Sequence, residues 1–143
     1  MKRLDRKSDC AINFSLQTFG DPWSLLIVRD IVFFGKKTYG EFLASDERIG
    51  TSVLANKLVS LEKEGILTKK LSTQDKRKEE YYLTQKGLDL IPILIDLTAW
   101  GAKYDPGTGA SKKWVKAIRS DRDAVVKRTI QVVRNGGSII KDF

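Results

Sequence analysis

The segment 51–70, TSVLANKLVSLEKEGILTKK, constrains the fold of this chain more than any other. Its leucines recur at Leu54, Leu58 and Leu61, a spacing that places them on one face of an α-helix. Gly65 ends the helical pattern, and the residues that follow are β-branched, aromatic and basic. We therefore predict a helix over residues 51–64, followed by a β-hairpin with strands over residues 66–71 and 80–84.

Two apolar helices precede this segment. The first is predicted over residues 10–19, with Asp9 as its N-cap residue, because apolar side chains recur there at helical spacing. The second opens with Asp21 as N-cap residue and Pro22 at the first helical position, where a missing N–H costs nothing. It continues through an apolar run to Gly35, and the density of apolar residues indicates burial on most sides.

A short third helix completes the pattern. Thr38 and Glu41 have the S/T-x-x-E spacing of a capping box, which places the start of this helix at Thr38. For helix 51–64 the N-cap residue is either Gly50 or Thr51. The order of helices and hairpin is typical of a winged helix-turn-helix, in which the second helix of the motif enters the DNA major groove. We therefore expect a mainly α (α+β) fold with a two-stranded β-hairpin wing and additional dimerisation helices.

The outward face of helix 51–64 is nearly uncharged, although the chain as a whole is strongly basic. Its 26 Lys and Arg exceed its 18 Asp and Glu, and the net charge of +8 favours an anionic partner such as double-stranded DNA. Short polar side chains on that face can reach base edges in the major groove. We predict base readout by Thr51, Ser52, Asn56, Val59 and Ser60. Contacts to the DNA backbone are predicted for Lys36, Lys37, Thr38, Lys57, Lys63, Lys76, Arg77 and Lys78.

The segment 88–104 predicts contact with a second copy of the chain. Thr84 caps a helix that continues to about Tyr104, and Pro92 marks either a kink in it or a boundary between two helices. Apolar residues surround nearly its whole circumference, which is more than a small domain can bury alone. The expected homodimer interface comprises Ile12, Leu16, Ile93, Leu94, Leu97 and Trp100. The alternative is that the C-terminal helix folds back and covers this surface.

The rest of the chain is an appendage to this unit. Residues 1–104 would form the winged helix-turn-helix DNA-binding domain, including the dimerisation helices, and composition marks 105–111 as a linker. Residues 112–143 would form a basic C-terminal helical extension, with nine Lys or Arg against three Asp. Within it we predict one helix over residues 113–135, followed by a frayed end.

Enzyme and metal chemistry find little support in the composition. The chain has no histidine, and its single cysteine cannot form an intrachain disulfide or a Cys-cluster metal site. We therefore expect no catalysis, no cofactor and no metal. Without an apolar run of about 18 residues or a signal peptide, the chain is expected in the cytoplasm, with no membrane partner. The alternative function is a winged-helix protein–protein adaptor or antirepressor, which would present an acidic or apolar recognition face instead of a neutral, polar one.

The chain resembles the HxlR-type family of MarR-like winged-helix transcriptional regulators. The matching features cover about residues 10–104 and are Cys10, Gly20, Trp23, LLIVRD (25–30), YGEF (39–42), IGTSVLANKLVSLEKEGIL (49–67), EYYLTQKG (80–87), LIPIL (90–94), Trp100 and Gly101. This resemblance implies a homodimer that acts as a sequence-specific repressor or activator. A small-molecule or electrophile effector is a further expectation.

Cys10 stands where this family typically has a cysteine, which in some members senses electrophiles or oxidants. It falls in the first turn of the predicted helix 10–19, where the helix dipole and preceding basic residues favour the thiolate and Asp9 opposes it. The alternative is that Cys10 is a small buried hydrophobic residue. We carry both interpretations forward, with Cys10 as the candidate redox sensor.

Overall fold

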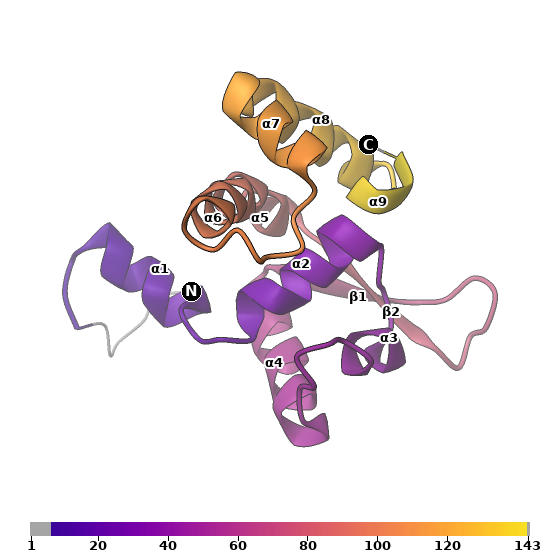
Figure 1. Cartoon of the computed structure of the whole chain (residues 1–143). Coiled ribbons are helices and arrows are strands. Elements are labelled where there is room, and N and C mark those ends of the chain that lie inside the picture. The colour runs from indigo at the N-terminus through magenta and orange to yellow at the C-terminus, as the bar shows by residue number, and fades with distance from the viewer. Residues whose placement is uncertain (1–6, 143) are drawn as a thin grey trace.

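The computed structural model describes residues 7–142 of the chain. The described residues form a helical body from which a two-stranded β-hairpin projects (Figure 1). In chain order, the elements are α1 (Ala11–Phe19), α2 (Ser24–Phe34), α3 (Tyr39–Leu43), α4 (Thr51–Lys63), β1 (Leu67–Leu71), β2 (Glu79–Leu83), α5 (Gln85–Leu88), α6 (Ile91–Tyr104), α7 (Lys112–Ser120), α8 (Arg122–Arg134) and α9 (Ile139–Asp142).

The core lies where α2, α4, the hairpin and α6 meet. Val28, Leu54 and Ile91 come from three different helices and are each fully buried. The predicted leucine face of α4 is confirmed, because Leu54, Leu58 and Leu61 are all buried. Burying a side chain of this size contributes about 1.5–3 kcal/mol, so these leucines fix which face of α4 points outward.

Local sequence determines where the helices of the helix-turn-helix begin and end. The Thr38 hydroxyl accepts the Glu41 N–H and the Glu41 carboxylate accepts the Thr38 N–H, which confirms the predicted capping box. Gly50 is the N-cap residue of α4, which settles the choice between Gly50 and Thr51. At the end of α2, Gly35 has φ 67°, a left-handed conformation that glycine adopts without steric cost.

Two predicted N-caps are wrong by one or two residues. In α1 the N-cap residue is Cys10 instead of Asp9, because Cys10 is the last extended residue before the first turn. The α2 helix begins at Ser24, with Trp23 as N-cap residue, instead of directly after Asp21. Asp21 still serves the start of α2, since its carboxylate accepts the N–H groups of Trp23 and Ser24.

The wing is an antiparallel pair with the register Leu67 to Leu83 and Leu71 to Glu79. Its inner edge is fastened to the helices by the Tyr81 N–H, which donates to the Lys37 carbonyl at 2.7 Å. Beyond the wing, Thr84 caps the short helix α5 as predicted, through its hydroxyl and the Gly87 N–H. Pro92 lies in the first turn of α6, so it marks a boundary between helices instead of a kink.

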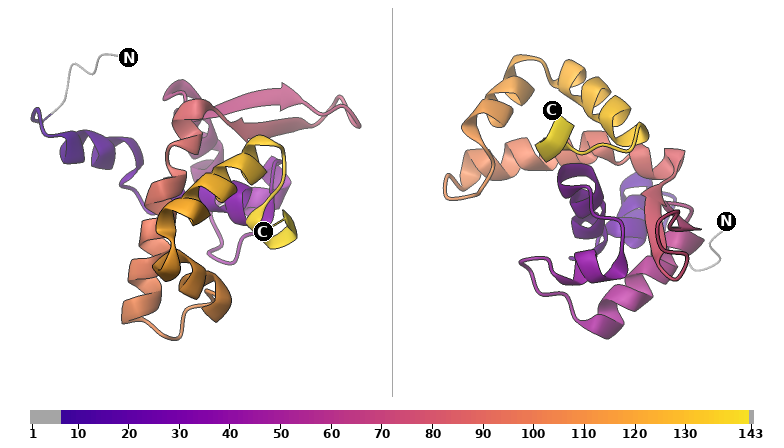
Figure 2. Two further views of the ribbon diagram at one scale, coloured as in Figure 1. Left: turned by 90° about the horizontal axis from the view of Figure 1, so that it is seen from above. Right: turned by 90° about the vertical axis from the view of Figure 1, so that its right-hand side faces the viewer.

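The C-terminal extension differs from its prediction. The single helix expected over 113–135 is broken at Asp121, whose φ of −156° is not helical and whose carboxylate caps α8 through the Ala124 N–H. The end expected to fray instead returns through a turn at Gly136 and forms α9, which packs on α2 with Ser138 and Ile139 buried. In two further views the extension arches over α6 (Figure 2).

Candidate nucleic-acid interface

Helix α4 presents an outward face of short, mostly polar side chains. All five residues predicted to read bases are exposed: Thr51, Ser52, Asn56, Val59 and Ser60. Val59 keeps 52% of its surface accessible, so its methyl groups are available for an apolar contact. Because no ionised group lies among these five residues, the face can approach base edges without an ion pair to desolvate.

The first turn of α4 is held in place by α3. The Tyr39 hydroxyl donates to the Thr51 carbonyl at 3.1 Å, which joins the two helices of the motif directly. Exposed positions on a rigid, packed helix hold their geometry better than positions on a loop. The candidate reading face is therefore a preformed surface.

The loop at the wing tip, residues 72–78, is shaped by its own hydrogen bonds. Buried Ser72 accepts the N–H groups of Gln74 and Asp75 with its hydroxyl and donates its own N–H to the Lys78 carbonyl. The Arg77 N–H donates to the Asp75 carboxylate. The predicted backbone-contacting residues of this loop, Lys76, Arg77 and Lys78, are all exposed, as is Lys63 at the end of α4.

The other predicted backbone-contacting residues are engaged within the chain. Lys57 lies 3.2 Å from the Asp21 carboxylate, and Lys36 donates to the Ser45 hydroxyl and lies 3.6 Å from Asp30. The Thr38 hydroxyl is already hydrogen-bonded in the capping box. The Lys37 ammonium lies over the Tyr82 ring, 5.3 Å from its centroid. The charges of Lys36, Lys37 and Lys57 are thus partly compensated. In the wing tip, the Arg77 guanidinium also lies 3.2 Å from the Asp75 carboxylate, whereas Lys63, Lys76 and Lys78 form no ion pair within 4 Å among the residues that the structure describes.

The turn before α4 is held in position by a network of ion pairs, which the sequence analysis did not predict. Asp30 is only 2% exposed, and its carboxylate contacts the Arg29 guanidinium at 2.7 Å and accepts the Ser45 hydroxyl. Arg29 also binds Glu47 with two hydrogen bonds, and their strength lowers the pKa of Glu47 to about 2. The same bonds to Glu47 raise the pKa of Arg29. The turn between α3 and α4 is thus tied to α2 by charge.

The predicted dimer residues divide into two groups. Leu94 is buried in the core of its own chain, so its prediction as an interface residue is wrong: α6 is rotated so that Ile91, Leu94 and Ile95 face inward. Five others are exposed: Ile12, Leu16, Ile93, Leu97 and Trp100.

The C-terminal extension does fold back, and Arg122 of α8 binds Asp96 of α6 with bonds of 2.6 and 2.9 Å. It leaves Leu97 and Trp100 uncovered, with Trp100 68% exposed.

Cys10 is exposed, which argues against the buried hydrophobic alternative. It stands immediately before the first turn of α1, and its N–H donates to the Ser8 hydroxyl. None of the residues of α1 is buried, and the helix extends away from the body of the molecule (Figure 1). The thiol is therefore accessible to a reagent from solution.

Residues 7–142, which the structure describes, contain no cluster of three His, Cys, Asp or Glu side chains suited to hold a metal ion. None of the described helices is long and apolar enough to span a membrane.

Fold and surface together define a class of protein. A helix-turn-helix with an exposed polar second helix, followed by a basic β-hairpin, is a winged helix-turn-helix, and proteins similar to this chain are transcriptional regulators. The family model described as HxlR-like helix-turn-helix matches residues 18–108. The chain belongs to this family of transcriptional regulators.

Individual relatives agree with this assignment. The chain is 30% identical over 105 residues to YdeP of Bacillus subtilis, an uncharacterized HTH-type transcriptional regulator, with 71% of this chain and 81% of YdeP covered. It is 32% identical over 96 residues to an uncharacterized HTH-type transcriptional regulator of Mycobacterium bovis, Mb3122, with 67% of this chain covered. That match spans 60% of the mycobacterial protein.

Solved structures show the same fold. The chain is similar to the redox regulator HypR in its oxidized form, with 29% identity, a TM-score of 0.59, and 66% of this chain and 96% of that chain covered. It is also similar to the reduced form of the transcriptional regulator YodB from B. subtilis, with 26% identity, a TM-score of 0.55, and 71% and 100% covered. The C-terminal extension lies beyond the family match.

Proposed function

We propose that this protein is a homodimeric, sequence-specific DNA-binding repressor that acts on a palindromic operator. The observation that carries the proposal is the outward face of α4, whose exposed residues are short, mostly polar and uncharged on a chain of net charge +8. An ordinary solvated helix on so charged a protein would carry Lys and Glu there. A neutral polar face flanked by positive charge is the arrangement that direct base readout uses.

The chemistry of each reading residue suggests a partner. Asn56 lies near the middle of the face, and an asparagine amide can pair with adenine through two hydrogen bonds. Ser52 and Ser60 can donate to or accept from either kind of base edge, and Val59 can contact a thymine methyl group. Thr51 is the first residue of α4 and lies next to the turn that joins α3 to α4.

Phosphate contacts fall to the exposed cations around that face. We assign this role to Lys63 and to the wing-tip residues Lys76, Arg77 and Lys78. Thr38 contributes less, because its hydroxyl is already hydrogen-bonded to Glu41. Lys36, Lys37 and Lys57 make smaller contributions because their charges are already shared with groups of the same chain. Such contacts fix the register of the protein on the duplex and carry no sequence information directly.

The dimer follows from apolar surface that the chain leaves uncovered. Leu97 and Trp100 on α6, with Ile93 beside them, form an exposed apolar stripe, and Ile12 and Leu16 expose another on α1. Two copies related by a two-fold axis would bury both stripes and place the two α4 helices in successive major grooves. The operator would then be an inverted repeat with half-sites roughly 34–36 Å apart. A dimer bound there represses by occupying the site.

We further propose that Cys10 senses electrophiles or oxidants. Its thiol is exposed and stands at the start of α1, an element assigned here to the dimer interface. Modification of the thiol would alter how α1 packs in the dimer and hence how the two α4 helices are spaced. HypR is described as a redox regulator, and the proposal extends that property to this chain through Cys10.

Selection of sheared genomic DNA by the purified protein tests the function. Retained fragments are sequenced after washing at near-physiological salt, because salt removes non-specific phosphate binding first. A few enriched fragments that share an inverted repeat are expected. Diffuse retention that is lost with salt would contradict sequence readout and favour the protein–protein adaptor.

A further inference from the structure

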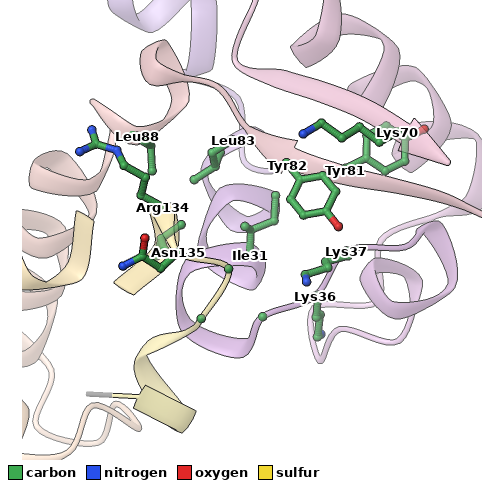
Figure 3. Close-up of a pocket in the computed structure, with 14 residues that line it drawn as sticks. Ile31, Lys36, Lys37, Lys70, Tyr81, Tyr82, Leu83, Leu88, Arg134 and Asn135 are labelled. Carbon is green, nitrogen blue, oxygen red and sulfur yellow. The ribbon is translucent and has the colours of Figure 1, made fainter. Parts of the chain in front are cut away.

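A cavity of about 420 Å³ opens between the base of the wing and the turn that joins α8 to α9 (Figure 3). We call it the wing-base cavity. Its walls come from the end of α2, the chain at Lys36 and Lys37, the two wing strands, α5 and residues 133–137. Pockets for small ligands usually measure about 300–1,000 Å³, so its size suits a small metabolite.

The charged side chains in the lining of the wing-base cavity are cationic. Among the residues that the structure describes, four cationic side chains line it and no Asp or Glu does. Figure 3 shows Lys70 on the wing, Lys36 and Lys37 on the chain that leaves α2, and Arg134 on the far side, with its guanidinium pointing away from the three lysines. A cavity that concentrates positive charge favours an anion over a neutral or cationic ligand.

Two of these cations lack a carboxylate partner. The ammonium groups of Lys37 and Lys70 lie 5.3 and 5.1 Å from the centroid of the same Tyr82 ring, and neither forms an ion pair within 4 Å among the residues that the structure describes. Glu80 stands opposite Lys70 in the ladder but accepts the Tyr82 hydroxyl. Lys36 is compensated by Asp30, and Arg134 donates to the neutral Gln85 amide.

The rest of the lining limits the kind of anion. Aliphatic side chains form the opposite wall, among them Ile31, Leu83, Leu88 and Val133. Both α2 and α8 end at the cavity, and the carbonyl groups at helix C-termini carry partial negative charge. Phosphate sites are typically built from the N–H groups of helix N-termini instead. A singly charged group with an apolar body therefore matches the lining better than a phosphate.

We propose that the wing-base cavity binds a small aliphatic carboxylate. The carboxylate lies at the Tyr82 ring, within the positive field of the Lys37 and Lys70 ammonium groups that flank the ring, and the hydrocarbon body lies against the wall formed by Ile31 and Val133. Part of the wall, residues 133–137, belongs to the C-terminal extension, outside the family match over 18–108. A bound acid would join the extension to strand β1 of the wing, through Lys70. Any effect of the acid on DNA affinity rests on the proposed function, whereas binding itself does not.

Calorimetric titration of the full chain tests the site with three probes: hexanoate, its uncharged amide hexanamide, and inorganic phosphate. Hexanoate should bind with a Kd of about 1 mM or lower, as expected for so few atoms, and at least about tenfold more tightly than the other two. The substitution Lys70→Ala should weaken hexanoate binding about tenfold. Lys70 is exposed, and an unchanged thermal midpoint will show that the variant is folded.

Lys69→Ala is the matched control, because the neighbouring residue points to the other face of the same strand and pairs with Glu79. It should leave hexanoate binding unchanged. Equal binding of acid and amide, no binding of the acid, or equal losses in the two variants would each overturn the proposal. If Lys70→Ala instead leaves hexanoate binding intact and lowers affinity for all DNA sequences alike, the cations serve DNA phosphates. The titration contains no DNA, so its failure is separate from any failure of the DNA-binding function.

Discussion

The Arg29 guanidinium in α2 donates two charge-assisted hydrogen bonds, of 2.6 and 2.9 Å, to the Glu47 carboxylate in the turn before α4. The same guanidinium contacts Asp30, so one side chain ties the buried helix of the motif to the turn from which the candidate reading helix starts. Arg48, the next residue in that turn, has φ 57°, a conformation that costs a non-glycine residue energy. The network and the strained residue together set the direction in which α4 leaves the turn.

Glu47→Gln should lower the free energy of unfolding at pH 7 by about 1 kcal/mol or less, because the pair is partly exposed and solvent screens it. Arg29 lowers the pKa of Glu47 from 4.5 to about 2. A carboxyl group whose pKa is lower in the folded state stabilises that state at every pH above its pKa in the unfolded state. This stabilisation is lost as the pH falls toward its pKa in the folded state. The difference between wild type and variant should therefore be full above pH 4.5 and vanish toward pH 2. Urea titrations at several pH values measure it, with exposed Asp46→Asn in the same turn as control. A difference that grows on acidification would contradict the assignment.

Replacing Lys76, Arg77 and Lys78 by Ala should weaken binding to all DNA sequences and flatten its salt dependence. Each lost phosphate contact lowers the slope of log K against log salt by about 0.9, so the slope should fall by about 2–3. Lys57→Ala is the comparison: it removes one cation, which already pairs with Asp21 at 3.2 Å, and it should therefore change the slope less than the loss of all three wing-tip cations. An unchanged slope in the triple variant would exclude the wing tip as a phosphate contact.

Asn56→Ala should relax base preference at one position of each half-site. Loss of a bidentate contact to a base costs about 1–3 kcal/mol at the specific site and little on non-specific DNA. Affinities measured for a set of single-base operator variants show whether the penalty for a mismatch disappears at one position. A uniform loss across all variants would mean that Asn56 contacts the backbone instead.

Trp100→Glu should dissociate the dimer, because the indole is 68% exposed in the single chain and a buried aromatic anchor contributes about 2–4 kcal/mol to an interface. Sedimentation velocity over a concentration series measures the change. Ile140→Glu is the matched control, since Ile140 is 66% exposed but lies outside the proposed interface. Equal effects of both substitutions would show that charge, and not the α6 surface, causes dissociation.

Cys10→Ser should keep specific DNA affinity and abolish its response to diamide. Serine preserves the size of the side chain at the N-cap position and removes the reactive sulfur. Operator binding is measured before and after diamide treatment of both proteins. A response that persists in the variant would refute sensing by Cys10.

The sequence predicted best where a local pattern decides the outcome. The leucine face of α4 and the capping box at Thr38 follow from spacing alone, and both are confirmed. The pairing of Arg29 with Glu47, 18 residues apart, has no periodic signal and could not be anticipated. The burial of Leu94 depends on how α6 rotates against the rest of the chain, which a helix apolar on all sides does not specify. The break at Asp121 was detectable in principle, because an aspartate before a new helix is a common N-cap.

The most direct test of the central claim compares an operator recovered by genomic selection with the same DNA in which one half-site is scrambled. A dimer that reads both half-sites through α4 should lose at least about 100-fold in affinity, since several mismatches at about 1–3 kcal/mol each accumulate in one half. Equal affinity for the intact and the half-scrambled DNA at near-physiological salt would contradict a sequence-reading dimer.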